Sequence, residues 1–236
     1  MVSLPNVLDR KLKLDDLVKS SEAFIFDFDD TLVDERFSVL NRWNAVLEKY
    51  QTILNCRDLK KSFLDIYNRE GTQYKRHIDD MLKMLKLDMN YKNQIIQDFL
   101  LQKSSSELIF PKAQEILELL SNNNFKIAMF TNGFRANQEY RVEIAGLKDL
   151  FTYIQYGDCA EKKPSPEGFL KLSKSLKLIE KNKFTLIGDS FEEDYHGASN
   201  FGAQCILINS NYKKKLQAPV YSSIDELYFD LVEILN

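Results

Sequence analysis

Five short and almost uninterrupted apolar runs mark the chain at intervals. They lie at Ala23–Phe28, Lys126–Phe130, Phe151–Tyr156, Phe184–Ile187 and Gln204–Ile208. Strands covered on both faces lack the alternation of a half-exposed strand, so these runs predict buried strands. Apolar residues recur at helical spacing just before the second run, within residues 113–120, and after the third run, within residues 169–176. Strands that alternate with helices predict an α/β fold with a Rossmann-like parallel sheet.

The interval between the first two runs breaks this rhythm. Residues 29–125 contain no comparable run, but apolar stripes at helical spacing cross them, for example from Trp43 to Tyr50. We therefore expect a small all-helical domain at 34–106, inserted into an α/β core domain formed by 1–33 and 107–236. The polar stretches Asp34–Glu35 and Ser104–Ser106 are the expected linkers.

Composition narrows the class of protein. Of 236 residues, 44% are apolar, and 32 Lys and Arg against 35 Asp and Glu give a net charge of −3. This balance excludes a general basic surface for nucleic acid, and no apolar run approaches the about 18 residues of a membrane span. The three cysteines, Cys56, Cys159 and Cys205, form no CxxC pair. We expect a cytoplasmic protein, monomeric or homodimeric, with neither a nucleic acid nor a membrane as partner, whose first 20 residues form an added amphipathic helix.

Carboxylates follow two of the predicted strands. Asp27 and Asp29 come at the end of the first run, and Asp189 and Asp194 follow the fourth. Carboxyl ends of parallel strands meet at one edge of a sheet, where open α/β sheets bind ligands. Several carboxylates in one space repel each other, and a hard cation such as Mg²⁺ relieves the repulsion. Taken alone, each acidic pair is more simply explained as turn or cap residues, and only its coincidence with other features favours chemistry.

Two further features accompany the carboxylates. The second run leads into Thr131 and Asn132, which offer a hydroxyl and an amide to an anionic oxygen, and Lys163 precedes a helix after the third run. Four such features at successive strand ends indicate a single site.

The same residues match four motifs of a known family. Phe24–Leu32 fits a DxDx(T/V)L motif, Thr131 a second motif, Lys163–Phe169 a Lys-Pro-x-Pro motif, and Gly188–Gly202 a GDSxxxD and GAxxxG motif. Over residues 22–210 the chain thus resembles the haloacid dehalogenase-like hydrolase superfamily, in its phosphatase branch with a helical cap. That family's α/β core and cap agree with the fold predicted above.

The resemblance implies a role for each motif residue. Asp27 is the expected nucleophile, which forms an aspartyl-phosphate, and Asp29 is the expected acid and base. Thr131 and the amide of Asn132 are expected to hold phosphoryl oxygens, and Lys163 to offset charge as a catalytic and phosphate-binding residue.

The resemblance also implies Mg²⁺ as the cofactor. The expected ligands are the carboxylates of Asp27 and Asp189 and the main-chain carbonyl of Asp29. Asp194 is expected to bind the metal directly or through water, and Thr31 to orient the first motif.

Together, these expectations predict that the protein is a Mg²⁺-dependent phosphatase. Its expected substrate is a small soluble phosphomonoester of the nucleotide or sugar phosphate class. A sugar phosphomutase is the nearest alternative function. A phospho-aspartate switch and a 2-haloacid dehalogenase are further alternatives, and the presence of Asp29 argues against both of these. Asp30 stands at a motif position where many relatives have glycine. An acidic residue at this position is similar to what some nucleotidases of the family have. We expect specificity to reside in the polar segment Asn68–His77, with His77 at the surface and Trp43 in the core of the cap.

Overall fold

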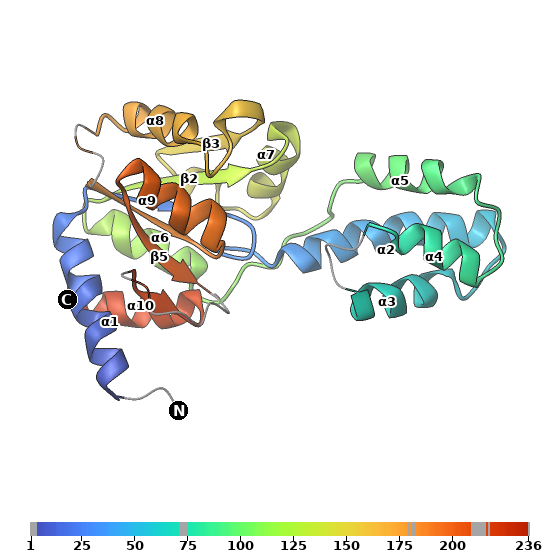
Figure 1. Ribbon diagram of the computed structural model, residues 1–236, viewed down its shortest axis with the longest axis horizontal. Helices are drawn as coiled ribbons and strands as arrows, with labels where there is room; N and C mark the ends of the chain where they lie inside the picture. The colour runs from blue at the N-terminus through green and yellow to red at the C-terminus, as the bar shows by residue number, and fades with distance from the viewer. Residues whose placement is uncertain are drawn as a thin grey trace. The chain divides into compact units, whose positions relative to one another are not determined.

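The computed structural model describes residues 4–70, 75–178, 180, 183–208, 216 and 218–235, with the side chains of residues 4–7 and 159 excepted. The chain divides into two compact units (Figure 1). One combines Met1–Asp34 with Leu108–Asn236, and the other is Glu35–Glu107. Both boundaries lie one residue beyond those expected. Among the described residues, no helix has the length and apolar character needed to cross a bilayer.

The first unit is built on a six-stranded parallel sheet. Its strands are β1 (Ala23–Phe26), β2 (Lys126–Asn132), β3 (Tyr153–Gly157), β4 (Phe184–Gly188), β5 (Gln204–Ile208) and β6 (Val220–Tyr221). The order across the sheet is β3-β2-β1-β4-β5-β6, which confirms the predicted Rossmann-like α/β core. At the end of β1, Phe26 is level with Met129 of β2 and Ile187 of β4. Sequence reasoning missed β6, because its two residues are too short to form an apolar run.

Helices cover both faces of this sheet. They are α1 (Leu4–Ser20), α6 (Ala113–Asn122), α7 (Arg135–Ile144), α8 (Pro166–Ser175), α9 (Gly197–Phe201) and α10 (Ile224–Leu235). Among the described residues, this unit also has three short helical turns: η1 (Lys148–Leu150), η2 (Cys159–Glu161) and the π-helical η4 (Phe191–His196).

Successive residues of β1 point to opposite faces of the sheet, as a pleated strand requires. Phe24 and Phe26 pack into a core with α1, α6, α7 and α10. Ala23 and Ile25 pack into a second core with α8 and α9. Burial on both sides explains why the strand reads as a continuous apolar run.

The N-terminal helix α1 belongs to the first of these cores. Leu14 and Val18 are buried there, as the expected amphipathic helix requires. Arg10 on the same helix pairs with Glu226 and Asp230 of α10, at 2.5 and 3.0 Å. Ion pairs and apolar contacts together fix α1 against the end of the chain.

The second unit contains four helices in the part that the structure describes: α2 (Glu35–Ile53), α3 (Leu59–Glu70), α4 (His77–Met84) and α5 (Tyr91–Leu101). Trp43 packs in its core as expected, with its ring stacked on Phe99 at 3.9 Å between centroids and 4.8 Å from Phe63. The expected surface position of His77 is wrong, since only 8% of the residue is exposed. Its ring packs beside Phe63 and Tyr67, so it completes the aromatic core of this unit.

Candidate active site

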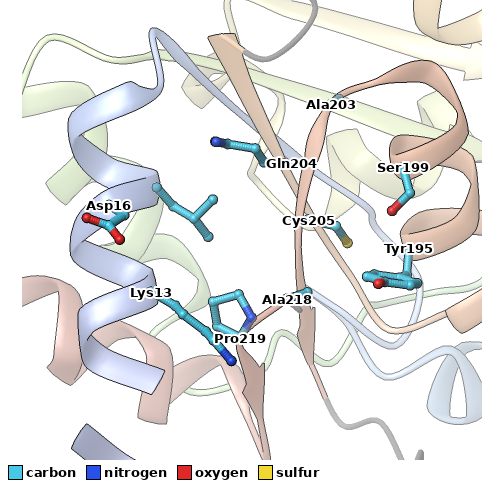
Figure 2. Close-up of a pocket in the computed structure, with 10 residues that line it drawn as sticks. Lys13, Asp16, Tyr195, Ser199, Ala203, Gln204, Cys205, Ala218 and Pro219 are labelled. Carbon is cyan, nitrogen blue, oxygen red and sulfur yellow. The ribbon is translucent and has the colours of Figure 1, made fainter. Parts of the chain in front are cut away.

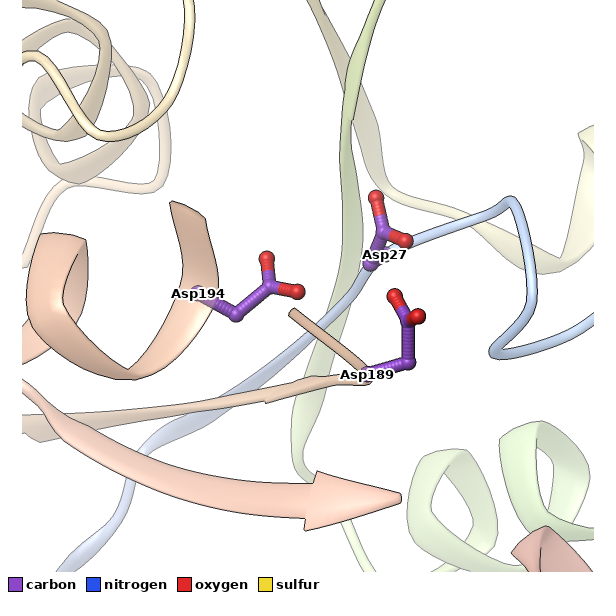
Figure 3. Close-up of side chains that lie close together, drawn as sticks. All are labelled: Asp27, Asp189 and Asp194. Carbon is purple, nitrogen blue, oxygen red and sulfur yellow. The ribbon is translucent and has the colours of Figure 1, made fainter. Parts of the chain in front are cut away.

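Three of the predicted carboxylates meet at the carboxyl ends of β1 and β4 (Figure 3). Asp27 follows β1 directly, and its backbone N–H donates to the carbonyl of Ile187 on β4 at 2.8 Å. Asp189 follows β4, and Asp194 reaches in from η4. One carboxylate oxygen from each of the three aspartates lies within 4.8 Å of the other two. The parallel sheet therefore brings together side chains that are distant in the sequence.

Gly188 makes room for Asp194 at the end of β4. A Cβ atom on Gly188 would lie 2.3 Å from Asp194 Cγ, far inside van der Waals contact. The Asp194 side chain is itself held, since its Oδ2 accepts a hydrogen bond from the backbone N–H of Ser190 at 3.0 Å. Ser190 also caps η4, because its Oγ accepts from the N–H of Glu193 at 3.2 Å. Gly188 and Ser190, the residues on either side of Asp189, thus position Asp194.

Lys163 is the cation of this cluster. Its Nζ donates to Asp27 Oδ1 at 2.5 Å and to Asp194 Oδ1 at 2.6 Å, and only 2% of the residue is exposed. Lys162 beside it is exposed. The side chain of Asn132 anchors the lysine's backbone: Lys163 N–H donates to Asn132 Oδ1 at 2.8 Å, and Asn132 Nδ2 donates to the Lys163 carbonyl at 3.0 Å. This bracing role of the Asn132 amide group was not foreseen from the sequence.

Burial and mutual repulsion dominate the electrostatics of the cluster. Burial raises the pKa of Asp27 well above its ordinary value, and the charges of Asp194 and Asp29 add to the shift while Lys163 opposes it. Burial and the charge of Asp194 raise the pKa of Asp189 to about 7. Burial alone would lower the pKa of Lys163, but Asp194 and Asp27 raise it, so the lysine stays protonated. Three carboxylates against one ammonium leave an excess of negative charge.

The carboxylate of Asp29 turns to a different set of partners. Its Oδ2 accepts a hydrogen bond from Gln138 Nε2 at 2.8 Å, and its Oδ1 pairs with Arg141 Nη1 at 2.6 Å. The same Gln138 Nε2 donates to Thr131 Oγ1 at 2.9 Å. Gln138 and Arg141 lie on α7, and both were missed by sequence reasoning. Their i, i+3 spacing on one helix face is the signal in the sequence, but it is a common one.

The turn after Asp29 accounts for the unusual residue at position 30. Asp30 has a φ of 53°, in the left-handed region that glycine adopts most easily and aspartate tolerates better than most residues. Its backbone N–H donates to the carbonyl of Val33 at 2.8 Å, which closes the turn. The buried Thr31 within this turn donates a long hydrogen bond to Asp27 Oδ2 at 3.5 Å. The turn thereby aims Thr31 back at Asp27.

A separate cavity of about 310 Å³ lies near the amino ends of β5 and β6 (Figure 2). Its lining includes Lys13 and Leu17 of α1, Gln204 at the start of β5 and Pro219 just before β6. The acidic cluster follows the carboxyl ends of β1 and β4, so the cavity adjoins the other end of the parallel sheet. None of the sequence-predicted site residues lines it.

Comparisons with known proteins agree with this arrangement. The family model for haloacid dehalogenase-like hydrolases matches residues 24–208. Pyrimidine 5'-nucleotidase YjjG of Escherichia coli is 29% identical over 122 residues, which are 50% of this chain and 54% of that one. Glyceraldehyde 3-phosphate phosphatase of Methanothermobacter thermautotrophicus is 26% identical over 203 residues, 80% of this chain and 86% of that one.

A solved structure shares the fold over most of both chains. The HAD-hydrolase YfnB of Bacillus subtilis, bound to magnesium, superposes with a TM-score of 0.65 at 20% identity, covering 89% of this chain and 98% of that one. At 20% identity, this similarity shows that the two chains share a fold and no more. The match to the nucleotidase spans only about half of that enzyme, so its activity is not carried over with the match.

Proposed function

Because the chain belongs to the haloacid dehalogenase-like hydrolase family, we propose that it is a phosphatase that forms an aspartyl-phosphate on Asp27. Family membership confirms the resemblance indicated by the four motifs. The observation that carries the proposal is the pairing of one buried lysine, Lys163, with both Asp27 and Asp194, at 2.5 and 2.6 Å. A lysine in this place can neutralise an incoming phosphoryl group as well as the nucleophile.

The donor set at the carboxyl edge fits Mg²⁺. The residues that would hold the ion are Asp27 and Asp189, with Asp194 directly or through water, all hard oxygen donors. By resemblance, the main-chain carbonyl of Asp29 would be a further donor. Asp194 completes the acidic group, with its two oxygens engaged by Lys163 and the Ser190 N–H. The raised pKa values of Asp27 and Asp189 mean that Lys163 alone does not fully compensate their negative charge, which supports a second cation at this site. When bound, Mg²⁺ would supply positive charge for the phosphoryl oxygens.

The first half of the proposed reaction moves the phosphoryl group onto the protein. A carboxylate oxygen of Asp27 attacks phosphorus, and the bond from phosphorus to the alcohol oxygen breaks. Asp29 gives its proton to that oxygen, so a neutral alcohol leaves. Thr131 donates its hydroxyl to a phosphoryl oxygen, and Lys163 offsets the charge on the group in transit.

The second half returns the protein to its starting state. A water molecule attacks phosphorus, Asp29 takes its proton, and the bond from phosphorus to the Asp27 oxygen breaks to release inorganic phosphate. Asp29 therefore ends with the proton that it lost in the first half, and the cycle balances. Two displacements replace a single difficult one.

For the substrate, we propose a small phosphomonoester of the nucleotide or sugar phosphate class. The named relatives, a pyrimidine 5'-nucleotidase and a glyceraldehyde 3-phosphate phosphatase, support this range. Asp30 in the first motif favours nucleotides by resemblance. We propose that the helical unit Glu35–Glu107 is the cap that selects the substrate. Part of the expected specificity segment, residues 71–74, lies outside the described residues.

Phosphate release tests the function directly. Purified protein with Mg²⁺ is expected to hydrolyse p-nitrophenyl phosphate and a pyrimidine nucleoside monophosphate. Asp27→Asn keeps the size of the side chain but loses the nucleophile, so the rate is expected to fall by about 10³-fold or more. Asp34→Asn, which changes a carboxylate at the unit boundary, serves as the control. Full activity of Asp27→Asn would overturn the proposal.

A further inference from the structure

Two buried polar residues of α7 contact the proposed acid and base, and no motif assigns them. Arg141 is 5% exposed and Gln138 is 3% exposed. Arg141 Nη1 lies 2.6 Å from Asp29 Oδ1, and Gln138 Nε2 donates to Asp29 Oδ2 at 2.8 Å. Each oxygen of the Asp29 carboxylate thus faces one of these two side chains.

The burial of Arg141 calls for an explanation. An arginine withdrawn from water loses several kcal/mol of hydration, and only well-placed partners recover it. Its guanidinium lies over the ring of Phe28, 5.1 Å from the centroid, and pairs with Asp29. Phe28 directly precedes Asp29, so Arg141 contacts the side chains of two successive residues of the first motif. An apolar residue of similar size would fill this space without the cost of burying a charge.

Arg141 also determines which way the Gln138 amide points. Its Nη1 donates to Gln138 Oε1 at 3.0 Å, which directs the amide NH₂ away from the guanidinium. That NH₂ lies within hydrogen-bond distance of three oxygens: Asp29 Oδ2, Thr131 Oγ1 at 2.9 Å and the Asn132 carbonyl at 3.0 Å. A reversed amide would set its oxygen against the Asp29 carboxylate and the Asn132 carbonyl, neither of which can donate. One orientation is therefore strongly favoured.

We propose that Arg141 and Gln138 are positioning residues that fix the Asp29 carboxylate for proton transfer. Arg141 contacts one carboxylate oxygen directly and orients Gln138, which contacts the other. Rotation of the Asp29 carboxylate is therefore restricted. The inference rests on the proposed function, because it assumes that Asp29 protonates the leaving oxygen. A carboxyl group held in one place, once protonated, transfers its proton to a bound substrate more efficiently than one that must first be oriented.

Leaving-group dependence separates this role from a merely structural one. A nitrophenolate leaves without a proton, whereas the alcohol of a nucleoside 5'-monophosphate needs one. The ratio kcat/KM covers the steps up to the aspartyl-phosphate. Arg141→Met is expected to lower kcat/KM for the nucleotide about tenfold more than for p-nitrophenyl phosphate, and Arg141→Lys to recover part of the difference. Arg135→Met, on the same helix but exposed, is the control.

Gln138→Leu provides the second variant, since it removes the amide while leaving Arg141 in place. It is expected to show the same selective loss if Arg141→Met does not fold. An equal loss on both substrates, or no loss, in the variant that folds would overturn the positioning role. Turnover of neither substrate by the unaltered protein would overturn the proposed function itself, and this inference with it.

Discussion

Lys163 Nζ lies 2.5 Å from Asp27 Oδ1, although 136 positions separate the two residues in the chain. The lysine follows β3 and the aspartate follows β1, and β2 lies between these strands in the sheet. Both side chains are almost fully buried. A buried pair of this kind is strongly destabilising to break, because it leaves a charge without compensation.

Replacing the lysine should therefore damage both stability and activity. Lys163→Met leaves Asp27 and Asp194 buried without a cation, so the free energy of unfolding is expected to fall by about 3–5 kcal/mol. The loss of charge stabilisation should lower kcat by about 10²-fold or more. Chemical denaturation and phosphate release measure the two effects. Lys162→Met, a change in the exposed neighbour, should alter neither, and an active Lys163→Met would contradict the role of the pair.

A substitution at Gly188 should impair the site by steric hindrance, without changing its charge. Gly188→Ala places a methyl group 2.3 Å from the present position of Asp194 Cγ, so Asp194 must move away from Lys163. We expect kcat/KM to fall at least tenfold while the charge of the site is unchanged. Gly146→Ala is the matched control. Its φ of 70° makes alanine costly by about 1 kcal/mol, but nothing lies within 4 Å of the new methyl group. Equal activity of the two variants would count against the steric argument.

The acidic cluster predicts dependence on a divalent cation. Treatment with EDTA should abolish phosphate release, and added Mg²⁺ should restore it. Asp189→Asn removes one of the three clustered carboxylates, so a higher Mg²⁺ concentration should be needed for half-maximal activity. Glu192→Gln, which alters an exposed carboxylate of η4, should leave that concentration unchanged. Undiminished turnover in EDTA would exclude the proposed cofactor.

The contact between α1 and α10 predicts a pH-dependent contribution to stability. Burial alone would raise the pKa of Glu226, but hydrogen bonds from Ser222 and the charge of Arg10 lower it. The folded pKa lies below the unfolded one, so the stabilisation is present above about pH 4.3 and is lost as the pH falls through the folded pKa. Glu226→Gln should cost about 1 kcal/mol at pH 7, and the cost should vanish toward pH 3.

Urea denaturation at the two pH values measures that difference. Glu233→Gln, which removes a more exposed partner of Lys11 on the same helix, is the comparison and should have little effect. A cost for Glu226→Gln that is independent of pH would show that the side chain contributes by packing rather than by charge.

Much of the architecture was readable from the sequence, for identifiable physical reasons. Strands buried on both faces, such as β1 and β4, leave continuous apolar runs, and the motif residues Asp27, Lys163 and Asp189 follow strand ends. Parallel pairing then brings those ends to one edge. Lys163, the lysine predicted for this edge, is buried, whereas its neighbour Lys162 is exposed.

Other features depend on packing that no local pattern encodes. Gln138 and Arg141 lie on α7, whose polar residues resemble those of a solvated helix, and only the tertiary fold turns them toward Asp29. His77 is buried because the rings of Phe63 and Tyr67 surround it, although histidine is more often partly exposed. The side chain of Asn132 braces Lys163 across two strand ends, a contact set by three-dimensional placement alone.

Asp27 is expected to carry the phosphoryl group during turnover. The most direct test quenches the protein in acid while it turns over substrate with Mg²⁺, reduces any acyl-phosphate with borohydride, and maps the modified peptide by mass spectrometry. We expect a reduced side chain at position 27 and none at Asp29 or Asp189. Phosphate release that proceeds with an unmodified Asp27 at every time point would contradict it.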